Sequence, residues 1–251
     1  MSILEMFEMK RTVRRQLKSY YWSALLVCMI VFVVSDTIVG TVAGLPITLY
    51  GAVNYLFSDR LLILALASFA LIFFVMGPME VGRARYFLCS YNGDYRIRNM
   101  FFAFTGVHYF KIVLIMAAFL LIVILPIVSV YLFIVFVTDV SVSTISFFIL
   151  MCFPGILSIH LLCRYRMLPY VLAENPKMSL REVWEENLSR TDSRKLEIFI
   201  IDLSFFALYI LGLFAFGIGA FFVRPYHEAT IVRFYHKIPE LKRIEAENAS
   251  Y

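Results

Sequence analysis

The residues with the clearest potential for chemistry are ionisable side chains in or beside long apolar stretches. Asp202 lies near the start of the apolar stretch 196–223, and Arg224, His227 and Glu228 follow that stretch directly. Arg224 and Glu228 are four residues apart, so a helix would place them on one face. Carboxylates, guanidinium groups and an imidazole held together in this way can bind an ion, transfer a proton or hold a polar headgroup.

Charged side chains inside a membrane cost about 2.5–3.5 kcal/mol each on insertion scales, so they normally face the interior of a helix bundle and are paired. We therefore predict a buried polar cluster. Its members are Asp202, Arg224, His227, Glu228 and Arg233, with Glu80 at its inner edge. We expect Arg233 to reach the depth of Asp202 on an antiparallel helix, with Glu80 as a rival partner. Either these pairs only lock the helices together, or they form a site for an ion, a proton or a lipid headgroup.

Two other patterns could indicate catalysis, but each lacks the residues that would complete it. Glu185, Glu186 and Arg190 match the E-E-x-x-x-R pattern of intramembrane CAAX-type proteases, whereas the two histidine motifs of those enzymes are missing. The surrounding pattern favours a solvated helix face. His160 and Cys163 share a helix face, but a structural zinc site needs four ligands. We expect no catalytic residue, no metal site and no cofactor.

The composition determines the class of protein that carries these residues. Of 251 residues, 61% are apolar and 16% are charged, against about 45–50% and about 25% in soluble domains. This balance excludes a soluble enzyme, a disordered chain and a disulfide-stapled secreted module. The net charge of +5 comes from basic residues next to apolar runs, which is typical of membrane topology and not of nucleic-acid binding. We predict a single integral membrane domain over residues 1–251.

A membrane-spanning helix needs about 20 apolar residues. Four runs meet this length clearly, at residues 20–39, 61–81, 112–137 and 145–168. The last apolar stretch is either one long span, or it turns near Gly217 and forms two spans at 196–216 and 220–237. With six spans, 21 of the 23 Lys and Arg residues lie on the cytoplasmic side, whereas with five the last four would lie outside. We therefore predict an all-α bundle of six spans in three hairpins, with both termini in the cytoplasm.

Two cytoplasmic segments are expected to form amphipathic helices. Ser179 and Glu182 have the spacing of a capping box, which predicts a helix that begins near Leu180. Its apolar residues recur at helical spacing, as in helices that lie at the inner membrane surface. The aromatic segment 100–104 fits the same role.

Three ordered motifs resemble a known family. They are GPMEVGRARYFL at residues 77–88, MLPYVLAENP at 167–176, and a third that runs from Leu211 through Gly217–Gly219 and PYHEAT at 225–230 to Tyr235. Together they resemble an uncharacterised family of integral membrane proteins from Gram-positive bacteria. That family is distantly similar to the membrane domain attached to some glycerophosphodiester phosphodiesterases. The resemblance implies a multi-pass bundle in the bacterial plasma membrane, without the separate domain that carries the phosphodiesterase chemistry.

These observations leave three hypotheses for the function. The leading one is a non-catalytic scaffold, accessory or immunity-type subunit, with membrane lipids and either a membrane protein or a second copy of this chain as partners, and no nucleic acid. The second is a small transporter or channel-like protein with a buried charged site. The third is a membrane-embedded enzyme that acts on lipid or peptide, with His160, His227 and Glu228 as its acid–base groups.

Overall fold

The computed structural model describes residues 3–50, 72–106, 108–137, 144–214 and 218–249, and these residues form helices and short connections without a strand. The elements, in chain order, are α1 (Ile3–Leu17), α2 (Tyr21–Tyr50), the π-helical turn η1 (Ile72–Met76), α4 (Gly77–Tyr91), the 3-10 helix η2 (Ile97–Phe104), α5 (Tyr109–Val137), α6 (Thr144–Arg164), α7 (Leu168–Glu174), α8 (Leu180–Thr191), α9 (Lys195–Phe214) and α10 (Ile218–Ala249). The all-helical fold expected from the sequence is therefore confirmed for this part of the chain.

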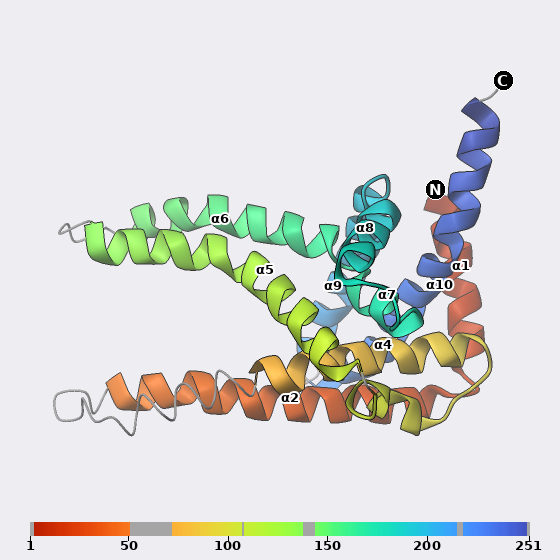
Figure 1. Ribbon diagram of the computed structural model, residues 1–251, viewed down its shortest axis with the longest axis horizontal. Helices are drawn as coiled ribbons and strands as arrows, with labels where there is room; N and C mark the ends of the chain where they lie inside the picture. The colour runs from red at the N-terminus through yellow and green to blue at the C-terminus, as the bar shows by residue number, and fades with distance from the viewer. Residues whose placement is uncertain (1–2, 51–71, 107, 138–143, 215–217, 250–251) are drawn as a thin grey trace.

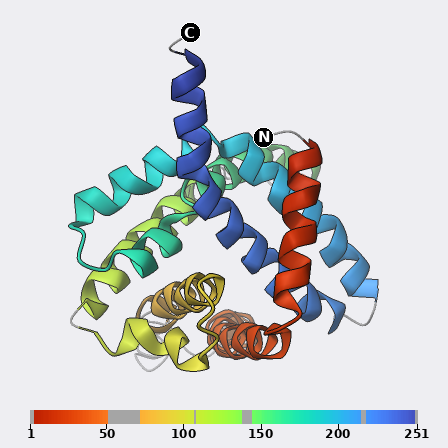
Figure 2. The same cartoon turned by 90° about the vertical axis from the view of Figure 1, so that its right-hand side faces the viewer.

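The long apolar helices extend from one end of the molecule, and the short helices gather at the other end. Helices α5 and α6 run side by side, and α2 lies on the opposite side with α4 packed against it (Figure 1). Helices α1, α7 and α8 lie at the end where both termini are marked, and α10 crosses between α1 and α8 (Figure 2). We call this end the cap.

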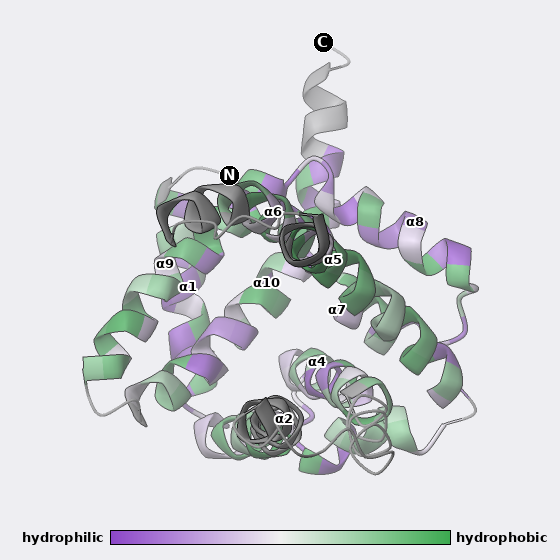
Figure 3. Cartoon of the chain, turned by 90° about the vertical axis from the view of Figure 1, so that its left-hand side faces the viewer, coloured by the Kyte–Doolittle hydropathy of each residue, from purple (hydrophilic) through white to green (hydrophobic). Residues whose placement is uncertain are grey.

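Two helices in the described residues are long and apolar enough to cross a membrane, Tyr109–Val130 and Lys195–Phe214. A third arises if Leu4–Leu17 and Tyr21–Ser35, which meet at 97°, count as one bent span. Helix α5 is almost entirely hydrophobic, whereas α8 is largely hydrophilic (Figure 3). Exposed apolar side chains such as Leu125, Phe153 and Phe214 cover the outer faces of α5, α6 and α9. Such faces need lipid or a protein partner to cover them.

Several helices differ in length from the expected spans. Of the expected span 61–81, residues 61–71 lie outside the described residues, and the helical part continues as α4 to Tyr91. This extension is buried because η2 packs directly on it: a Cβ atom on Gly82 would lie 1.9 Å from the Met100 carbonyl oxygen. Helix α6 ends at Arg164, before the expected end of the fourth span, and α10 continues through Pro239 to Ala249.

Helices α9 and α10 form an antiparallel hairpin, so the stretch 196–223 does not continue as one long helix. Helix α9 ends at Phe214 and α10 begins at Ile218. Near the turn, Gly212 and Gly219 let the two backbones touch: a Cβ atom on Gly212 would lie 2.6 Å from the Ala220 nitrogen. The glycines therefore act as a close helix contact.

The capping box expected at the start of α8 is present. The Ser179 hydroxyl accepts a hydrogen bond from the Glu182 amide at 3.3 Å, and the Glu182 carboxylate accepts one from the Ser179 amide at 2.7 Å. Both expected amphipathic segments lie in the described residues, but the second forms the short helix η2. Met100 and Ala103 in η2 are buried against α4, while Phe101 and Phe104 are exposed.

Candidate functional site

The candidate site is centred on Glu228 of α10, whose side chain is fully buried. Its Oε1 atom lies 3.2 Å from Arg224 Nε, 3.3 Å from Arg83 Nη2 and 3.9 Å from Arg166 Nη2. Its Oε2 atom accepts a hydrogen bond of 2.5 Å from the Tyr170 hydroxyl. One carboxylate therefore faces three guanidinium groups that come from α10, α4 and the connection before α7.

Two further carboxylates extend this arrangement. Glu80 pairs with Arg83 one turn along α4, and Asp202 of α9 lies 3.6 Å from Arg166 Nε. Asp202 Oδ1 also lies 2.7 Å from His227 Nε2, and the Tyr209 hydroxyl lies 3.1 Å from His227 Nδ1. Three arginines thus alternate with three carboxylates in one connected group. We call it the arginine–carboxylate network: Glu80, Arg83, Arg166, Asp202, Arg224 and Glu228.

Three proline-containing segments bring most of these charges together. Pro78 and Pro169 lie in the first turns of α4 and α7. Amide groups in a first turn have no partner within the helix, so a proline there breaks no helical hydrogen bond. The α4 segment supplies Glu80 and Arg83, and the α7 segment supplies Tyr170, with Arg166 just before it. Pro225 lies inside α10, between Arg224 and Glu228. The three motifs that carry the family resemblance therefore meet at the network.

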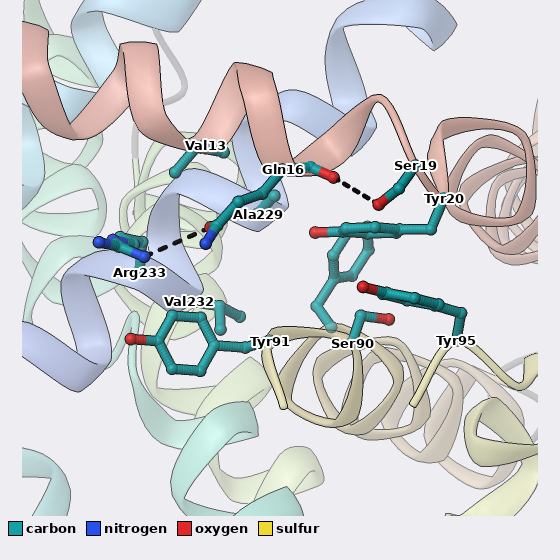
Figure 4. A pocket seen from close by; sticks show the side chains of 11 residues that line it. Val13, Gln16, Ser19, Tyr20, Ser90, Tyr91, Tyr95, Ala229, Val232 and Arg233 are labelled. Atoms are coloured by element: carbon teal, nitrogen blue, oxygen red, sulfur yellow. Dashed lines mark hydrogen bonds between the residues drawn. The ribbon is translucent and has the colours of Figure 1, made fainter. Parts of the chain in front are cut away.

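The structure brings five of the six predicted cluster residues together, namely Glu80, Asp202, Arg224, His227 and Glu228. Arg233 does not lie in this group. It donates a hydrogen bond to Gln16 at 3.3 Å and lies 5.7 Å from the ring centre of Tyr91 (Figure 4). The expected pairing of Arg233 with Asp202 or Glu80 is not formed, because five residues along a helix rotate a side chain by about 140°, away from the face of Glu228 and toward α1.

Arg233 lines a separate small cavity of about 110 Å³ at the cap. Tyr20 and Tyr95 stack there with their ring centres 4.7 Å apart, and Ser19 and Ser90 border the same space (Figure 4). A cavity of this size holds a few water molecules at most. It joins α1 to the end of α4 and does not contact the network.

Sequence reasoning missed Arg83, Arg166 and Tyr170. All three lie in or next to the first two motifs, but the arginines were counted as cytoplasmic charges because they follow the ends of apolar runs. Arg83 and Tyr170 are buried in the structure. The signal that could have revealed them is the repeated association of a proline with an arginine and an acid or tyrosine in each motif.

Two cavities border the network. The larger, of about 580 Å³, lies between α5, α6 and α9, with apolar walls that include Phe119, Ile159, Leu203 and Phe206. The smaller, of about 370 Å³, lies between α2, α9 and α10. Glu80, Arg83 and Arg224 line both, so the network separates them. Arg166, Asp202 and His227 line the larger cavity alone.

The other candidate residues lie apart from this site. His160 is exposed on α6 and Cys163 is partly buried, and no group of three His, Cys, Asp or Glu side chains in the described ranges could hold a metal ion. Glu185 pairs with Arg181 on an exposed face of α8, as expected for a solvated helix. Arg190 pairs with Glu186 at 2.6 Å, also contacts Glu174 at 3.4 Å and lies over the Tyr235 ring, which holds α8 to α10.

Where the structure describes the chain, the fold and the site are those of a helical protein with two or three helices apolar enough to cross a membrane and a buried ionic network between helices. A family model described as "Protein of unknown function (DUF975)" matches residues 3–242, so this chain belongs to that family. No curated protein and no solved structure matches the chain.

Proposed function

We propose that this protein is a non-catalytic, multi-pass protein of the bacterial plasma membrane that acts as a scaffold, accessory or immunity-type subunit through contacts with lipid or another membrane protein. One observation carries the proposal: the charged side chains of the network pair with one another inside the molecule, while the outer faces of α5, α6 and α9 are apolar. This inside-out distribution of polarity suits a lipid environment.

The surroundings of Glu228 and His227, two of the three acid–base candidates, support a non-catalytic role. Glu228 is fully buried next to three arginines and accepts a hydrogen bond from Tyr170, so a substrate proton has no direct access to it. Both ring nitrogens of His227 already have partners. A general base must instead reach the proton that it removes.

The proposal includes six spans with both termini in the cytoplasm. In a cysteine-free background, Glu245→Cys is placed in α10 and Asn54→Cys in the expected outer loop, and intact cells are treated with a membrane-impermeant maleimide. We expect labelling at residue 54 on intact cells and at residue 245 only after the membrane is permeabilised. Labelling at residue 245 on intact cells would contradict the six-span topology.

A small transporter is the second candidate, because the network separates two cavities that share Glu80, Arg83 and Arg224. The purified protein is reconstituted in liposomes that contain a pH-sensitive dye, next to its Asp202→Asn and Glu228→Gln variants. A scaffold or accessory subunit gives no more proton flux than empty liposomes. A flux that the wild-type protein supports and the two variants lose would replace the first proposal with this one.

A further inference from the structure

We propose that the larger cavity binds the phosphate-bearing headgroup of an inner-leaflet phospholipid, with Arg224 and Arg166 as the phosphate contacts. This inference rests on the proposed membrane location and names the lipid chemistry that the site would take. The smaller cavity and the cap cavity are not part of it.

The cavity has the polarity of an amphiphile. Its apolar walls carry Phe119, Ile159, Leu203 and Phe206, and its polar part is lined by Arg166 and Arg224 together with Glu80, Arg83 and Asp202 of the network. Ile159, Leu203 and Phe206 are also among the exposed apolar side chains. An acyl chain could therefore leave between α6 and α9 while the headgroup stays inside. The volume of about 580 Å³ is within the range of about 300–1,000 Å³ that is usual for small-molecule sites.

Three arginines balance three carboxylates in the network, and among the arginines Arg224 has the fewest carboxylate neighbours. In the described residues, Arg83 lies next to Glu80 and Glu228, and Arg166 lies next to Asp202 and Glu228, whereas Arg224 has Glu228 alone. Arg224 is also the most accessible of the three, with 40% of its side chain exposed. Glu80 lines the cavity as well, but its charge is matched by Arg83.

The arginines retain donors for a ligand. Glu228 Oε1 accepts no hydrogen bond, so the three guanidinium groups are attracted to it by charge and do not donate to that atom. A guanidinium group has five N–H donors in a planar fork, and it binds phosphate oxygens in pairs. Arg224 and Arg166 can therefore contact a phosphate while they remain next to Glu228.

The position of the site along the helices selects the inner leaflet. Arg166 follows the end of α6 by two residues, and Asp202 lies seven residues into α9, or about 10 Å at 1.5 Å per residue. In the proposed topology both of these helix ends are cytoplasmic. A headgroup that enters between them comes from the inner leaflet.

Binding is measured by native mass spectrometry of the purified full-length protein after removal of co-purified lipid. The probes are dioleoyl phosphatidylglycerol, dioleoylglycerol, which lacks the phosphate, and inorganic phosphate. We expect a saturable one-to-one complex with phosphatidylglycerol. Dioleoylglycerol should bind about tenfold more weakly than phosphatidylglycerol, because without a phosphate it cannot accept the charge-assisted hydrogen bonds. Inorganic phosphate should not bind measurably.

Two pairs of variants locate the complex. Arg224→Gln should weaken phosphatidylglycerol binding about tenfold, whereas Arg181→Gln on the exposed face of α8 should leave it unchanged. Because Arg224→Gln also removes a neighbour of Glu228, a second pair leaves the network intact. Leu203→Trp fills the apolar part of the cavity and should block binding, while Leu211→Trp, on the same helix but outside the cavity, should not.

The proposal is overturned if phosphatidylglycerol binds Arg224→Gln or Leu203→Trp as tightly as it binds the wild-type protein. It is also overturned if inorganic phosphate binds as tightly as the lipid, because the apolar walls would then have no role. These results are independent of the labelling at residue 245. If the lipid does not bind and residue 245 is cytoplasmic, only the proposed site is rejected. If the lipid binds and residue 245 is labelled on intact cells, only the topology is rejected.

Discussion

At the scale of single residues, Glu228 is the group on which the ionic interior depends. It supplies one negative charge to three arginines, and Tyr170 holds its second oxygen. A buried ion pair is not by itself stabilising, because desolvation of the charges opposes their attraction. Removal of one partner is nevertheless costly, because the remaining charges stay buried without compensation.

We therefore expect Glu228→Gln to destabilise the protein strongly. Breaking a buried pair typically costs about 3–5 kcal/mol, and here three guanidinium groups lose their shared counter-ion. The measurement is thermal unfolding of the purified protein in detergent. Glu185→Gln is the matched control, because Glu185 pairs with Arg181 on the exposed face of α8 and should not change the Tm. Equal effects of the two substitutions would show that the network does not hold the helices together.

Only part of the arginine–carboxylate network could be predicted from the sequence. Asp202, His227 and Glu228 could be predicted to lie together because a charge in an apolar run needs a buried partner. Their partners Arg83 and Arg166 could not be predicted, because an arginine at the end of an apolar run is equally compatible with solvent. The chain turns inward between α6 and α7, over residues 165–167, and this turn places Arg166 next to Glu228. Its direction depends on tertiary packing and not on local propensity.

At the scale of elements, local signals gave reliable helix starts and poor helix ends. The start of α8 followed from Ser179 and Glu182, since a capping box is a local hydrogen-bond pattern. The extension of α4 to Tyr91 did not follow, because this segment could equally form a loop and is helical where η2 packs on it. The continuation of α10 to Ala249 was not predicted either. Helices α9 and α10 form a hairpin, but of these two only α9 has the length and hydropathy of a span in the described residues, so a sixth span remains our proposal.

The contact of η2 with α4 depends on Gly82. A Cβ atom there would lie 1.9 Å from the Met100 carbonyl oxygen, so Gly82→Ala should force the two elements apart. Overpacking of this kind typically costs about 1–3 kcal/mol. Gly155→Ala in α6 is the control, since a Cβ atom there meets nothing within 4 Å and alanine favours a helix. Thermal unfolding should give a lower Tm for the first variant and an unchanged or higher one for the second.

The capping box at the start of α8 should make the stability of the folded protein depend on pH. The hydrogen bond from the Ser179 amide holds the pKa of the Glu182 carboxyl below its ordinary value. A lowered pKa means that the carboxylate stabilises the folded state above the pKa of the unfolded chain, and that this stabilisation is lost as the pH falls through the folded pKa. The Tm of the wild-type protein should exceed that of Glu182→Gln at neutral pH and approach it in acid. A difference that does not change with pH would contradict this account.

At the scale of the whole molecule, the structure combines an ionic interior, apolar outer faces and a polar cap. The composition predicted a membrane protein, because 61% apolar residues cannot be hidden from water in a chain of this length, and the lengths of the apolar runs predicted helices. Two or three helices within the described ranges meet the length and hydropathy of a span, which supports the membrane assignment, and the six spans remain our proposal. The cap could be predicted only in part, since α1, α8 and α10 meet there through contacts between residues far apart in the sequence.

The orientation of the cap can be tested with the two tryptophans. Trp22 is 75% exposed near the bend between α1 and α2, whereas Trp184 of α8 packs edge-on against Tyr165. In liposomes with brominated acyl chains, we expect strong quenching of Trp22 fluorescence in a Trp184→Phe variant. Trp184, observed in a Trp22→Phe variant, should be quenched less. Stronger quenching of Trp184 would place the cap helix α8 deeper in the membrane than the bend.

The order of the charges along the chain has a consequence for biogenesis. Arg83 and Arg166 leave the ribosome well before Glu228, which lies in the last helix. Until that helix is made, Arg83 has Glu80 and Arg166 has Asp202 as a counter-ion, but the carboxylate that joins the two pairs does not yet exist. Completion of the chain therefore serves as the closing step of assembly. A protein that ended before α10 would keep two separate ion pairs in place of the connected network.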